Sequence, residues 1–420
     1  MSDLSRRDFI RTSAATAATA TILANGNFAY AAAGDTIRVA LIGCGGRGTG
    51  ALTDNMNSGE KGLEVVALGD VFKDRVDGCY NYAKGAFKER CKVTPETCFS
   101  GFDAYKKVLA TNVDLVILAT PPGFRPIHFA AAIEAGKNVF MEKPVAVDPA
   151  GVRKVIAAAK MAKDKKLGVV AGTQRRHQRN YVETMKRIHD GQIGDIVGGQ
   201  VYWNQGGLWS RQKEAGWSDM EWQIRNWLYL TWLSGDHIVE QHVHNIDVAN
   251  WAFNTHPDKV VALGGREVRK DPVFGQIFDH FAMDYVYPND VHVLSMCRQI
   301  DGCASNVSER IVGTLGTTNC SGWIGGKNAW NIEGDTPPPY VQEHIDLIKS
   351  IRAGTPLNEG QRIAESTLTA IMGRMSAYTG KEVTWDFAMN KSTLDITPKT
   401  FEMGKIDVPA VAIPGTTKLE

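Results

Sequence analysis

The chain lacks an excess of either charge, an apolar run long enough to cross a membrane, and a paired cysteine motif. Its 47 basic residues nearly equal its 46 acidic ones and form no runs of like charge, which argues against a nucleic-acid or anionic-membrane partner. Its seven cysteines stand singly, without C-x-x-C spacing, which argues against a disulfide framework or a zinc ribbon and predicts free thiols. A small neutral partner suits this composition better.

The first 33 residues are predicted to be an export signal. Ser5-Arg6-Arg7-Asp8-Phe9-Ile10 carries the twin-arginine pattern, and the mild Ala/Thr-rich stretch that follows is too weakly apolar to span a membrane. Small residues before Ala32 and Gly34 offer cleavage sites. The alternative is a basic amphipathic start that stays in the cytoplasm. The pattern favours a protein exported already folded to the periplasm or another extracytoplasmic space, which is typical of enzymes that carry a cofactor.

Residues 34–172 are predicted to form an α/β Rossmann domain with a doubly wound parallel sheet. The chain of 420 residues is long enough for two domains with separate cores. Helical periodicity at 127–135 and 152–163 alternates with short apolar runs, which favours parallel strands covered by helices. The apolar runs typical of buried strands lie at 37–42, 63–68, 113–119, 139–141 and 167–171.

Residues 173–389 are predicted to form an α+β domain around a large, mainly antiparallel open sheet. Apolar and polar residues alternate in several segments, and a Pro288-Asn289-Asp290 turn joins two of them. Helical patterns at 341–352 and 363–377 are expected to pack against this sheet. Residues 390–420 have little periodicity and are predicted to be a tail. The predicted strands of the second sheet lie at 196–204, 260–268, 280–287, 291–296 and 304–313.

A glycine-rich dinucleotide fingerprint follows the first predicted strand. In Gly43-Cys44-Gly45-Gly46-Arg47-Gly48, Gly43 suits a tight turn, Gly45 lets the backbone approach a pyrophosphate, and Gly48 lets a helix pack closely on the strand. Asp70 ends the second strand, where a carboxylate accepts hydrogen bonds from ribose hydroxyls and favours NAD over NADP. The predicted cofactor site contains Gly43, Gly45, Gly46, Arg47, Gly48 and Asp70.

Two further motifs resemble the Gfo/Idh/MocA oxidoreductase family. They are Ala119-Thr120-Pro121-Pro122 and Glu142-Lys143-Pro144, and the resemblance covers essentially the whole chain after the signal. It implies that Glu142 lies near the nicotinamide ribose, that Lys143 contacts the cofactor and reaches the substrate hydroxyl, and that Thr120 and Pro121 also contact the cofactor. Without the family, a lysine before proline would be interpreted as a surface charge.

The second family signature is an acid followed by histidine and aspartate. Here it is Glu240, His244 and Asp247, which would share one face of a helix. The resemblance makes His244 the proton-transfer partner, with Glu240 orienting it and Asp247 behind. Relatives usually have Asp in place of Glu240 and Gly in place of His242. If the segment were a strand, Glu240, His242 and His244 could instead hold a metal together with Asp236 or His237, but the helical pattern that follows favours a site without metal.

Several side chains are candidates for contacting a sugar. Six tryptophans fall between positions 203 and 232, and aromatic faces stack on the C–H faces of sugars. Core packing would equally explain any single one of them. Relatives often place an arginine pair after the last Rossmann strand, which favours Arg175 over Arg176. The predicted substrate residues are Arg175, His237, Asp247, Trp203 and Trp209.

These residues predict an enzyme that transfers hydride between a sugar or polyol and a tightly bound NAD. An exported enzyme finds no free dinucleotide, so the hydride must return to a second substrate or to the same one. The second case is redox-neutral glycoside cleavage, which needs a further acid or base, with Tyr229, His237 and His242 as candidates. A sugar-binding protein with a vestigial cofactor site is the third class. The resemblance also implies a homodimer or homotetramer.

Overall fold

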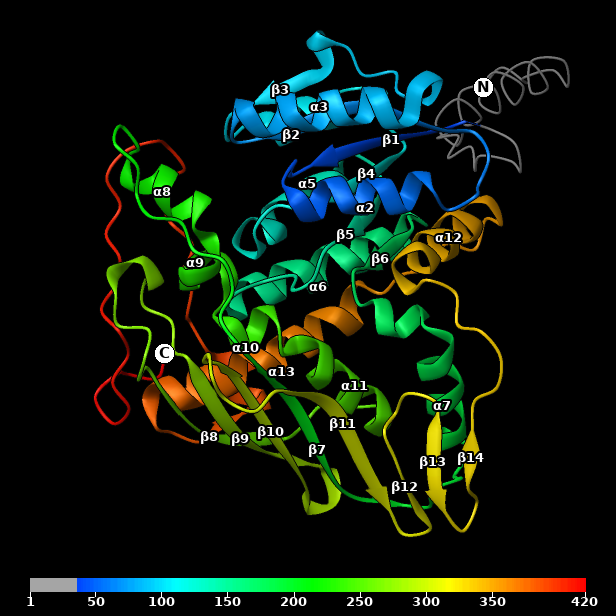
Figure 1. Ribbon diagram of the computed structural model, residues 1–420, viewed down its shortest axis with the longest axis vertical. Helices are drawn as coiled ribbons and strands as arrows, with labels where there is room; N and C mark the ends of the chain where they lie inside the picture. Colours follow the sequence, from blue (N-terminus) through cyan, green and yellow to red (C-terminus); the bar gives the residue numbers. More distant parts are fainter. Residues whose placement is uncertain (1–35) are drawn as a thin grey trace, which may run out of the picture.

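The computed structural model describes residues 36–420, so the predicted signal segment lies outside the described residues (Figure 1). The first half of the chain forms a six-stranded parallel sheet with the order β3-β2-β1-β4-β5-β6. This is the doubly wound order of dinucleotide-binding domains, with its crossover between β1 and β4. The strands are β1 Ile37–Ile42, β2 Leu63–Asp70, β3 Cys98–Ser100, β4 Leu115–Leu118, β5 Asn138–Met141 and β6 Val169–Ala171.

The five strands predicted in this half are confirmed, and most of their residues are apolar and buried. β3 was missed because it is a three-residue edge strand that is only partly buried. Helices cover both faces of the sheet, with α2 and α3 contributing to one buried cluster and α4, α5 and α6 to the other. These helices are α2 Gly46–Met56, α3 Lys73–Phe87, α4 Ala104–Leu109, α5 Arg125–Glu134 and α6 Pro149–Asp164.

The second half of the chain is organised around a nine-stranded sheet with the order β14-β13-β12-β11-β7-β10-β9-β8-β15. The predicted large, mainly antiparallel open sheet is confirmed: the central pair of β7 and β10 is parallel, and the other pairs are antiparallel. The alternation of apolar and polar residues predicted which face of each strand is buried, but it could not predict which strands pair with one another. The strands are β7 Ile196–Gln205, β8 Lys259–Gly265, β9 His280–Tyr287, β10 Val291–Gln299, β11 Asn306–Gly313, β12 Gly316–Thr318, β13 Trp323–Gly326, β14 Trp330–Asn331 and β15 Val383–Thr384.

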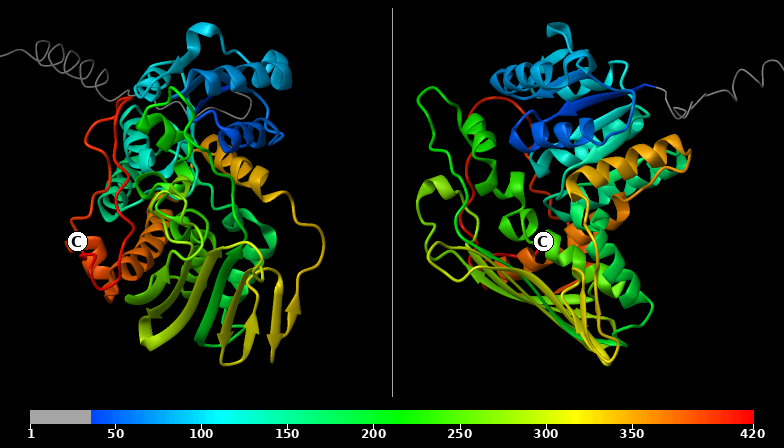
Figure 2. Two further views of the ribbon diagram at one scale, coloured as in Figure 1. Left: turned by 60° about the vertical axis from the view of Figure 1, so that its left-hand side comes forward. Right: turned by 45° about the vertical axis from the view of Figure 1, so that its right-hand side comes forward.

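Helices cover one face of the nine-stranded sheet and leave the other open (Figure 2, right). The long α13 packs on β8 and β9, while α11 packs on β7 and β11. None of the described helices is long and apolar enough to cross a membrane. The remaining helices of this half are α7 Arg179–His189, α8 Asp219–Arg225, α9 Thr231–Ser234, α10 His237–Glu240, α11 Val243–Phe253, α12 Pro339–Arg352 and α13 Gly360–Thr379.

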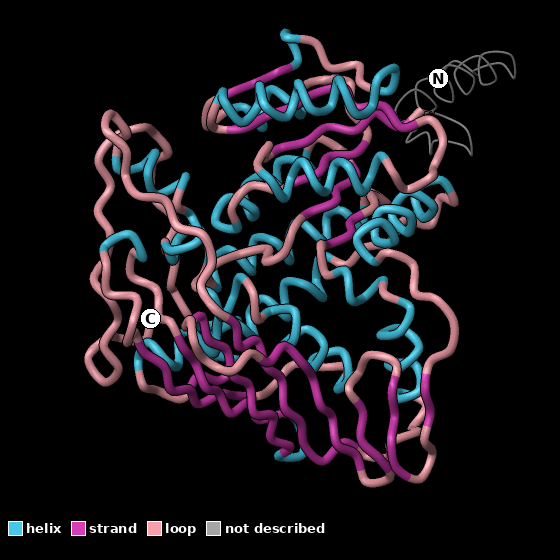
Figure 3. The backbone as a smooth tube through the Cα atoms, in the orientation of Figure 1, coloured by secondary structure: helices cyan, strands magenta, loops and turns pink. Residues whose placement is uncertain are grey.

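Helix α12 does not pack against the second sheet, contrary to the sequence prediction. It lies on α2 and β6 of the first domain, where Leu347, Ile348 and Ile351 join the apolar cluster of the parallel sheet (Figures 1 and 3). Its amphipathic pattern correctly indicated a buried face, but periodicity cannot indicate which sheet receives that face. A segment far along the chain therefore completes one side of the dinucleotide-binding half.

The C-terminal tail runs back along the outside of the molecule beside α8 and α9 (Figure 1). Phe401 packs against Phe124, and the carbonyl of Gly404 accepts a hydrogen bond from the Met220 amide at 3.1 Å. The tail encloses a cavity of about 840 Å³ against Trp232 and Tyr378. This cavity is separate from the one that holds the predicted chemistry.

Candidate active site

The predicted cofactor and catalytic residues gather at one cleft of about 740 Å³ between the two halves of the molecule. Its upper wall is the carboxyl edge of the parallel sheet, where dinucleotides bind in open α/β folds. Its opposite wall comes from α10, α11 and the tryptophan-rich segment after β7. The predicted residues that line it are Gly43, Gly45, Gly46, Arg47, Gly48, Asp70, Thr120, Pro121, Glu142, Lys143, Trp203, Trp209, Glu240 and His244.

The glycine turn is shaped for a close backbone approach. Gly43 has a left-handed φ of +102°, and a Cβ on it would lie 2.5 Å from the carbonyl carbon of Ala119. A Cβ on Gly48 would lie 1.8 Å from the Gly43 carbonyl oxygen. At Gly45 and Gly46 an added Cβ meets nothing within 4 Å, so the turn is open toward the cleft. Packing explains the first two glycines, and the open space above the other two suits a phosphate group.

Asp70 is held firmly at the end of β2. One carboxylate oxygen accepts the Cys44 amide at 2.7 Å, and the other accepts the Phe72 amide at 3.0 Å. Burial raises the pKa of this carboxyl, while the two amide donors partly offset that effect. Each oxygen keeps a lone pair for a ligand hydroxyl, as ribose recognition requires.

Lys143 and Glu240 meet across the cleft from elements 97 residues apart in sequence. The Lys143 Nζ donates to the Glu240 carbonyl at 2.5 Å and to its Oε1 at 3.0 Å. The predicted continuous helix through Glu240 and His244 is wrong, because a turn at Gln241 and His242 separates α10 from α11. The His244 amide bonds to the Gln241 carbonyl at 3.4 Å instead. The break frees the Glu240 carbonyl to accept the lysine.

His244 lies at the first turn of α11, with its ring stacked on Trp203 at a centroid distance of 5.6 Å. Burial lowers its pKa well below the usual value, and the charges of Lys143 and Arg175 lower it further. The imidazole is therefore neutral at pH 7. Its Nδ1 has no hydrogen-bond partner within residues 36–420. A neutral imidazole that lines the cleft can accept a proton from a substrate hydroxyl.

Sequence reasoning missed Arg125, which is almost fully buried at the edge of the cleft. Its Nη2 donates to the Thr120 carbonyl at 2.6 Å, and its Nε donates to the Glu142 carbonyl at 3.0 Å. One side chain thus ties together the two loops that carry the family motifs. Burial lowers the pKa of Arg125 to about 10, so it stays charged. Arg125 lies three residues after Pro122 of the first family motif, which could have marked it as a candidate. Only the fold shows that it contacts the loops of both motifs.

Aromatic side chains form part of the cleft wall. Trp203 and Trp209 line the cleft as predicted, and Trp227 joins them with its ring 6.1 Å from that of Trp209 in an edge-to-face arrangement. Arg211 also lines this end and was not predicted. Of the six clustered tryptophans, Trp232 packs in the core, with its Nε1 bonded to Gln223. The wall offers aromatic faces and a cation to a polar ring-shaped ligand.

Comparison with known proteins agrees with this geometry. Residues 37–170 match the model of the oxidoreductase family with an NAD-binding Rossmann fold, and residues 181–319 match the GFO/IDH/MocA C-terminal domain. The chain belongs to the Gfo/Idh/MocA family. Residues 3–22 match the twin-arginine translocation signal, which confirms the predicted signal sequence and indicates export.

Relatives within this family act on polyols and sugars according to their names. The inositol 2-dehydrogenase/D-chiro-inositol 3-dehydrogenase of Halalkalibacterium halodurans is 34% identical over 162 residues, which are 38% of this chain and 42% of the relative. A glycosyl hydrolase family 109 protein of Streptomyces coelicolor is 29% identical over 169 residues, which are 40% of this chain and 34% of the relative. The chain thus spans less than half the length of these two relatives.

Solved structures of the family share the fold over most of the chain. The aldose-aldose oxidoreductase from Caulobacter crescentus aligns with a TM-score of 0.65 at 18% identity, covering 83% of this chain and 99% of that one. A putative myo-inositol dehydrogenase from Sinorhizobium meliloti aligns with a TM-score of 0.60 at 18% identity, with the same coverage. At this identity the likeness establishes the architecture alone.

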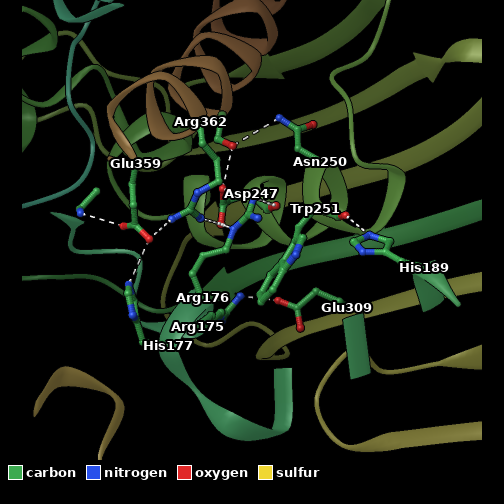
Figure 4. A network of polar contacts seen from close by, with 12 residues as sticks. Arg175, Arg176, His177, His189, Asp247, Asn250, Trp251, Glu309, Glu359 and Arg362 are labelled. Carbon is green, nitrogen blue, oxygen red and sulfur yellow. Dashed lines mark hydrogen bonds and ion pairs between the residues drawn. The ribbon is translucent and has the colours of Figure 1, made fainter. Parts of the chain in front are cut away.

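Three of the residues predicted to contact the substrate lie outside the lining of the cleft. Arg175 lies behind Trp203 and pairs with the buried Glu309. His237, the first residue of α10, is fully buried. Asp247 faces away from the cleft and binds Arg176 at 2.8 and 2.9 Å (Figure 4). The helix break turned Asp247 away from Glu240, and sequence spacing could not reveal that.

The alternative metal site does not assemble. Among residues 36–420 there is no group of three or more His, Cys, Asp and Glu side chains that could hold a metal ion. The turn at Gln241 points His242 into the core, where its Nε2 bonds to Ser295 Oγ at 2.6 Å. Glu240 binds Lys143 instead. The seven cysteines, all in the described part, are free, as predicted.

His177, Glu359 and Arg362 belong to a buried network of ion pairs behind the cleft, and the stability that this network contributes depends on pH (Figure 4). His177 bonds to Asp346 of α12 at 2.7 Å and lies 3.3 Å from Glu359, just before α13. Burial alone would lower the pKa of His177, but hydrogen bonds to Asp346 and Glu359 outweigh it and raise that pKa to about 9. Arg362 and His177 likewise outweigh burial at Glu359 and lower its pKa to about 2.

This network predicts a loss of stability at alkaline pH. Between the ordinary histidine pKa of about 6.5 and about 9, the folded protein holds a proton on His177 that the unfolded chain has released. Stability from this group is therefore complete below pH 6.5 and falls as the pH rises, by up to about 1.4 kcal/mol per pH unit. Urea unfolding of His177→Gln should show a flatter pH dependence in this window. The exposed His189→Gln serves as control, and an unchanged slope in His177→Gln would contradict the assignment.

Proposed function

We propose that the protein is an NAD-dependent oxidoreductase that acts on a secondary hydroxyl of a sugar or polyol and keeps its dinucleotide bound. The observation that carries the proposal is the single cleft in which Lys143, Glu240 and His244 face the glycine turn. A hydride acceptor and a proton acceptor must both lie near one carbinol carbon, and this cleft provides room for both.

The residues present fit a dinucleotide. Gly45 and Gly46 leave open space at the N-terminus of α2, and Asp70 keeps lone pairs for ribose hydroxyls. Asp70 supports NAD over NADP, because a 2′-phosphate beside it would meet like charge. Lys73, which could soften that repulsion, is bound to Asp77 at 2.6 Å, although Arg75 does line the cleft.

The chain's own groups can manage the proton of the substrate hydroxyl. The ammonium group of Lys143 has three N–H donors, of which Glu240 takes two, so one remains for a substrate oxygen. That contact stabilises developing negative charge on the oxygen. Neutral His244 accepts the hydroxyl proton, and Trp203 and Trp209 hold the ring. Nicotinamide, when bound, supplies the hydride acceptor.

Export restricts how the hydride is returned. The periplasm or another extracytoplasmic space holds no free dinucleotide pool, so a cofactor released after each turnover would be lost. We propose ping-pong transfer, in which one sugar is oxidised and a second carbonyl compound is reduced on the same cofactor. The enzyme would need no added nucleotide.

Redox-neutral glycoside cleavage is the second candidate, favoured by the similarity to the glycosyl hydrolase family 109 protein. Its elimination step needs a further acid or base at the cleft. Tyr229, His237 and His242 were the candidates, but all three are fully buried, and none lines the cleft. The oxidoreductase therefore remains the better-supported function. A sugar-binding protein with a vestigial cofactor site does not require the contact between Lys143 and Glu240.

One experiment distinguishes the oxidoreductase, the glycosidase and the sugar-binding protein. We expect denatured pure protein to release NAD, measured by liquid chromatography, and a protein without dinucleotide would refute the proposal. The loaded enzyme is then incubated with a panel of sugars and nitrophenyl glycosides without nucleotide. A keto-sugar formed only with a second carbonyl acceptor supports ping-pong transfer. Release of nitrophenol shows the glycosidase instead, and no product from any substrate favours the binding protein.

We further propose that the protein assembles as a homodimer or homotetramer through the open face of the nine-stranded sheet. Val261 and Leu263 of β8 and Leu294 of β10 point outward there, and Leu263 is 74% exposed. The adjacent outward row aligns Leu263, Ala282 and Met296 across three strands. A broad, partly apolar sheet face is stabilised by burial against a second copy.

A further inference from the structure

Arg47 and Tyr340 meet at the cofactor end of the cleft although they are far apart in sequence. Arg47 is the second residue of α2, directly after the open glycines, and Tyr340 is the second residue of α12. Both line the cleft. The guanidinium carbon of Arg47 lies 5.0 Å from the centre of the Tyr340 ring, which is the geometry of a cation–π contact.

Both side chains have further partners at the cleft edge. The Arg47 Nε donates to Glu142 Oε1 at 2.5 Å, and its Nη2 lies 3.3 Å from Asp54. The Tyr340 hydroxyl accepts a hydrogen bond from Gln174 Nε2 at 3.3 Å. These contacts connect the start of α2, the ends of β5 and β6, and the start of α12. Together they form a bridge over the edge of the cleft.

The bridge has a rigid support. Leu347 and Ile348 of α12 are fully buried in the cluster of the parallel sheet. The far end of the helix is fixed by Arg352, whose Nη1 bonds to Glu60 at 2.5 Å. Tyr340 itself is 43% exposed, so its ring is a surface feature on a buried helix. Replacing it changes the cleft edge without opening the core.

We infer that Arg47 and Tyr340 form a latch that slows release of the dinucleotide. The inference rests on the proposed function, because it concerns the same bound NAD. Arg47 follows the glycines where a pyrophosphate would bind, so a departing dinucleotide must pass its side chain. Moving that side chain away breaks the contact with the ring and strains the pair with Glu142. Tyr340 is thus a positioning residue for cofactor retention.

The test measures exchange of bound NAD for isotopically labelled NAD by mass spectrometry on intact loaded protein. We expect Tyr340→Ala to exchange about tenfold faster, which corresponds to about 1.4 kcal/mol and matches a partly desolvated cation–π contact. Tyr340→Phe keeps the ring and should stay within about threefold of the wild type, because it loses only one long hydrogen bond. Tyr82→Ala is the matched control, since Tyr82 is 44% exposed and does not line the cleft.

The outcomes distinguish the latch from the function. Wild-type protein without any dinucleotide would refute the proposed function. Wild-type protein that holds NAD, together with Tyr340→Ala that exchanges at the wild-type rate, would overturn the latch and leave the function standing. Equal acceleration in Tyr340→Ala and Tyr340→Phe would also overturn it, because the ring would then contribute nothing.

Discussion

Lys143→Ala is expected to lower turnover by at least about a thousandfold, the scale of lost acid–base and electrostatic catalysis. The bound NAD should remain, because two of the Lys143 N–H groups donate hydrogen bonds to Glu240 and not to the glycine turn. Turnover is measured with the sugar and acceptor pair found active on the wild type. The NAD content of each preparation is measured after denaturation.

Lys107→Ala is the control for this substitution. Lys107 is an exposed lysine paired with Asp103 at 2.9 Å and does not line the cleft, so its loss should leave both turnover and NAD content unchanged. Full activity in Lys143→Ala would remove Lys143 from the mechanism. Loss of NAD together with activity would instead make it a cofactor ligand.

Asp247→Ala is expected to have the largest effect on stability, lowering the free energy of unfolding by about 3–5 kcal/mol. The carboxylate accepts two hydrogen bonds from Arg176 and one from Ser366 at 2.8 Å, all in the interior (Figure 4). Burial alone would raise the pKa of Asp247, but Arg176 outweighs it and lowers that pKa. Removing the aspartate leaves the guanidinium buried without its partner. Urea unfolding of cofactor-free protein measures the loss.

Asp103→Ala provides the matched comparison for Asp247→Ala. It also removes an aspartate from a salt bridge, but the pair with Lys107 is exposed, so the loss of stability should be small. Similar losses in the two variants would show that the buried network does not hold the second domain together. Ordinary unfolding of Asp103→Ala with early unfolding of Asp247→Ala is the expected result.

Features encoded by neighbouring residues could be predicted from sequence. Short, mainly apolar runs indicated the parallel strands. The glycine spacing indicated the turn after β1, because the steric limits of a tight turn act within a few residues. Asp70 was found in the same way, because it is the last residue of β2, whose carboxyl end lies at the cleft. Lys143 was found only through the family resemblance. Their predicted roles in cofactor and substrate binding remain proposals.

Features that depend on a break in a helix, or on a partner residue distant in sequence, were not predicted. The spacing of Glu240, His244 and Asp247 would place all three on one face of a continuous helix. The turn at Gln241 instead separates α10 from α11, and Asp247 pairs with Arg176. His237 and Arg175 were both predicted to contact the substrate, yet His237 is fully buried within α10 and Arg175 pairs with Glu309. A polar residue type does not reveal whether its partner is a substrate or the protein itself.

The amino-acid sequence by itself determined the export signal, the dinucleotide fold and the glycine turn, because local sterics and hydrophobic periodicity encode all three. Tertiary structure alone decided that α12 leaves the second sheet for the first, that β7 pairs in parallel with β10, and that Tyr340 reaches Arg47. These outcomes depend on which apolar faces fit together across hundreds of residues. Packing complementarity of that kind has no signature in a single stretch of chain.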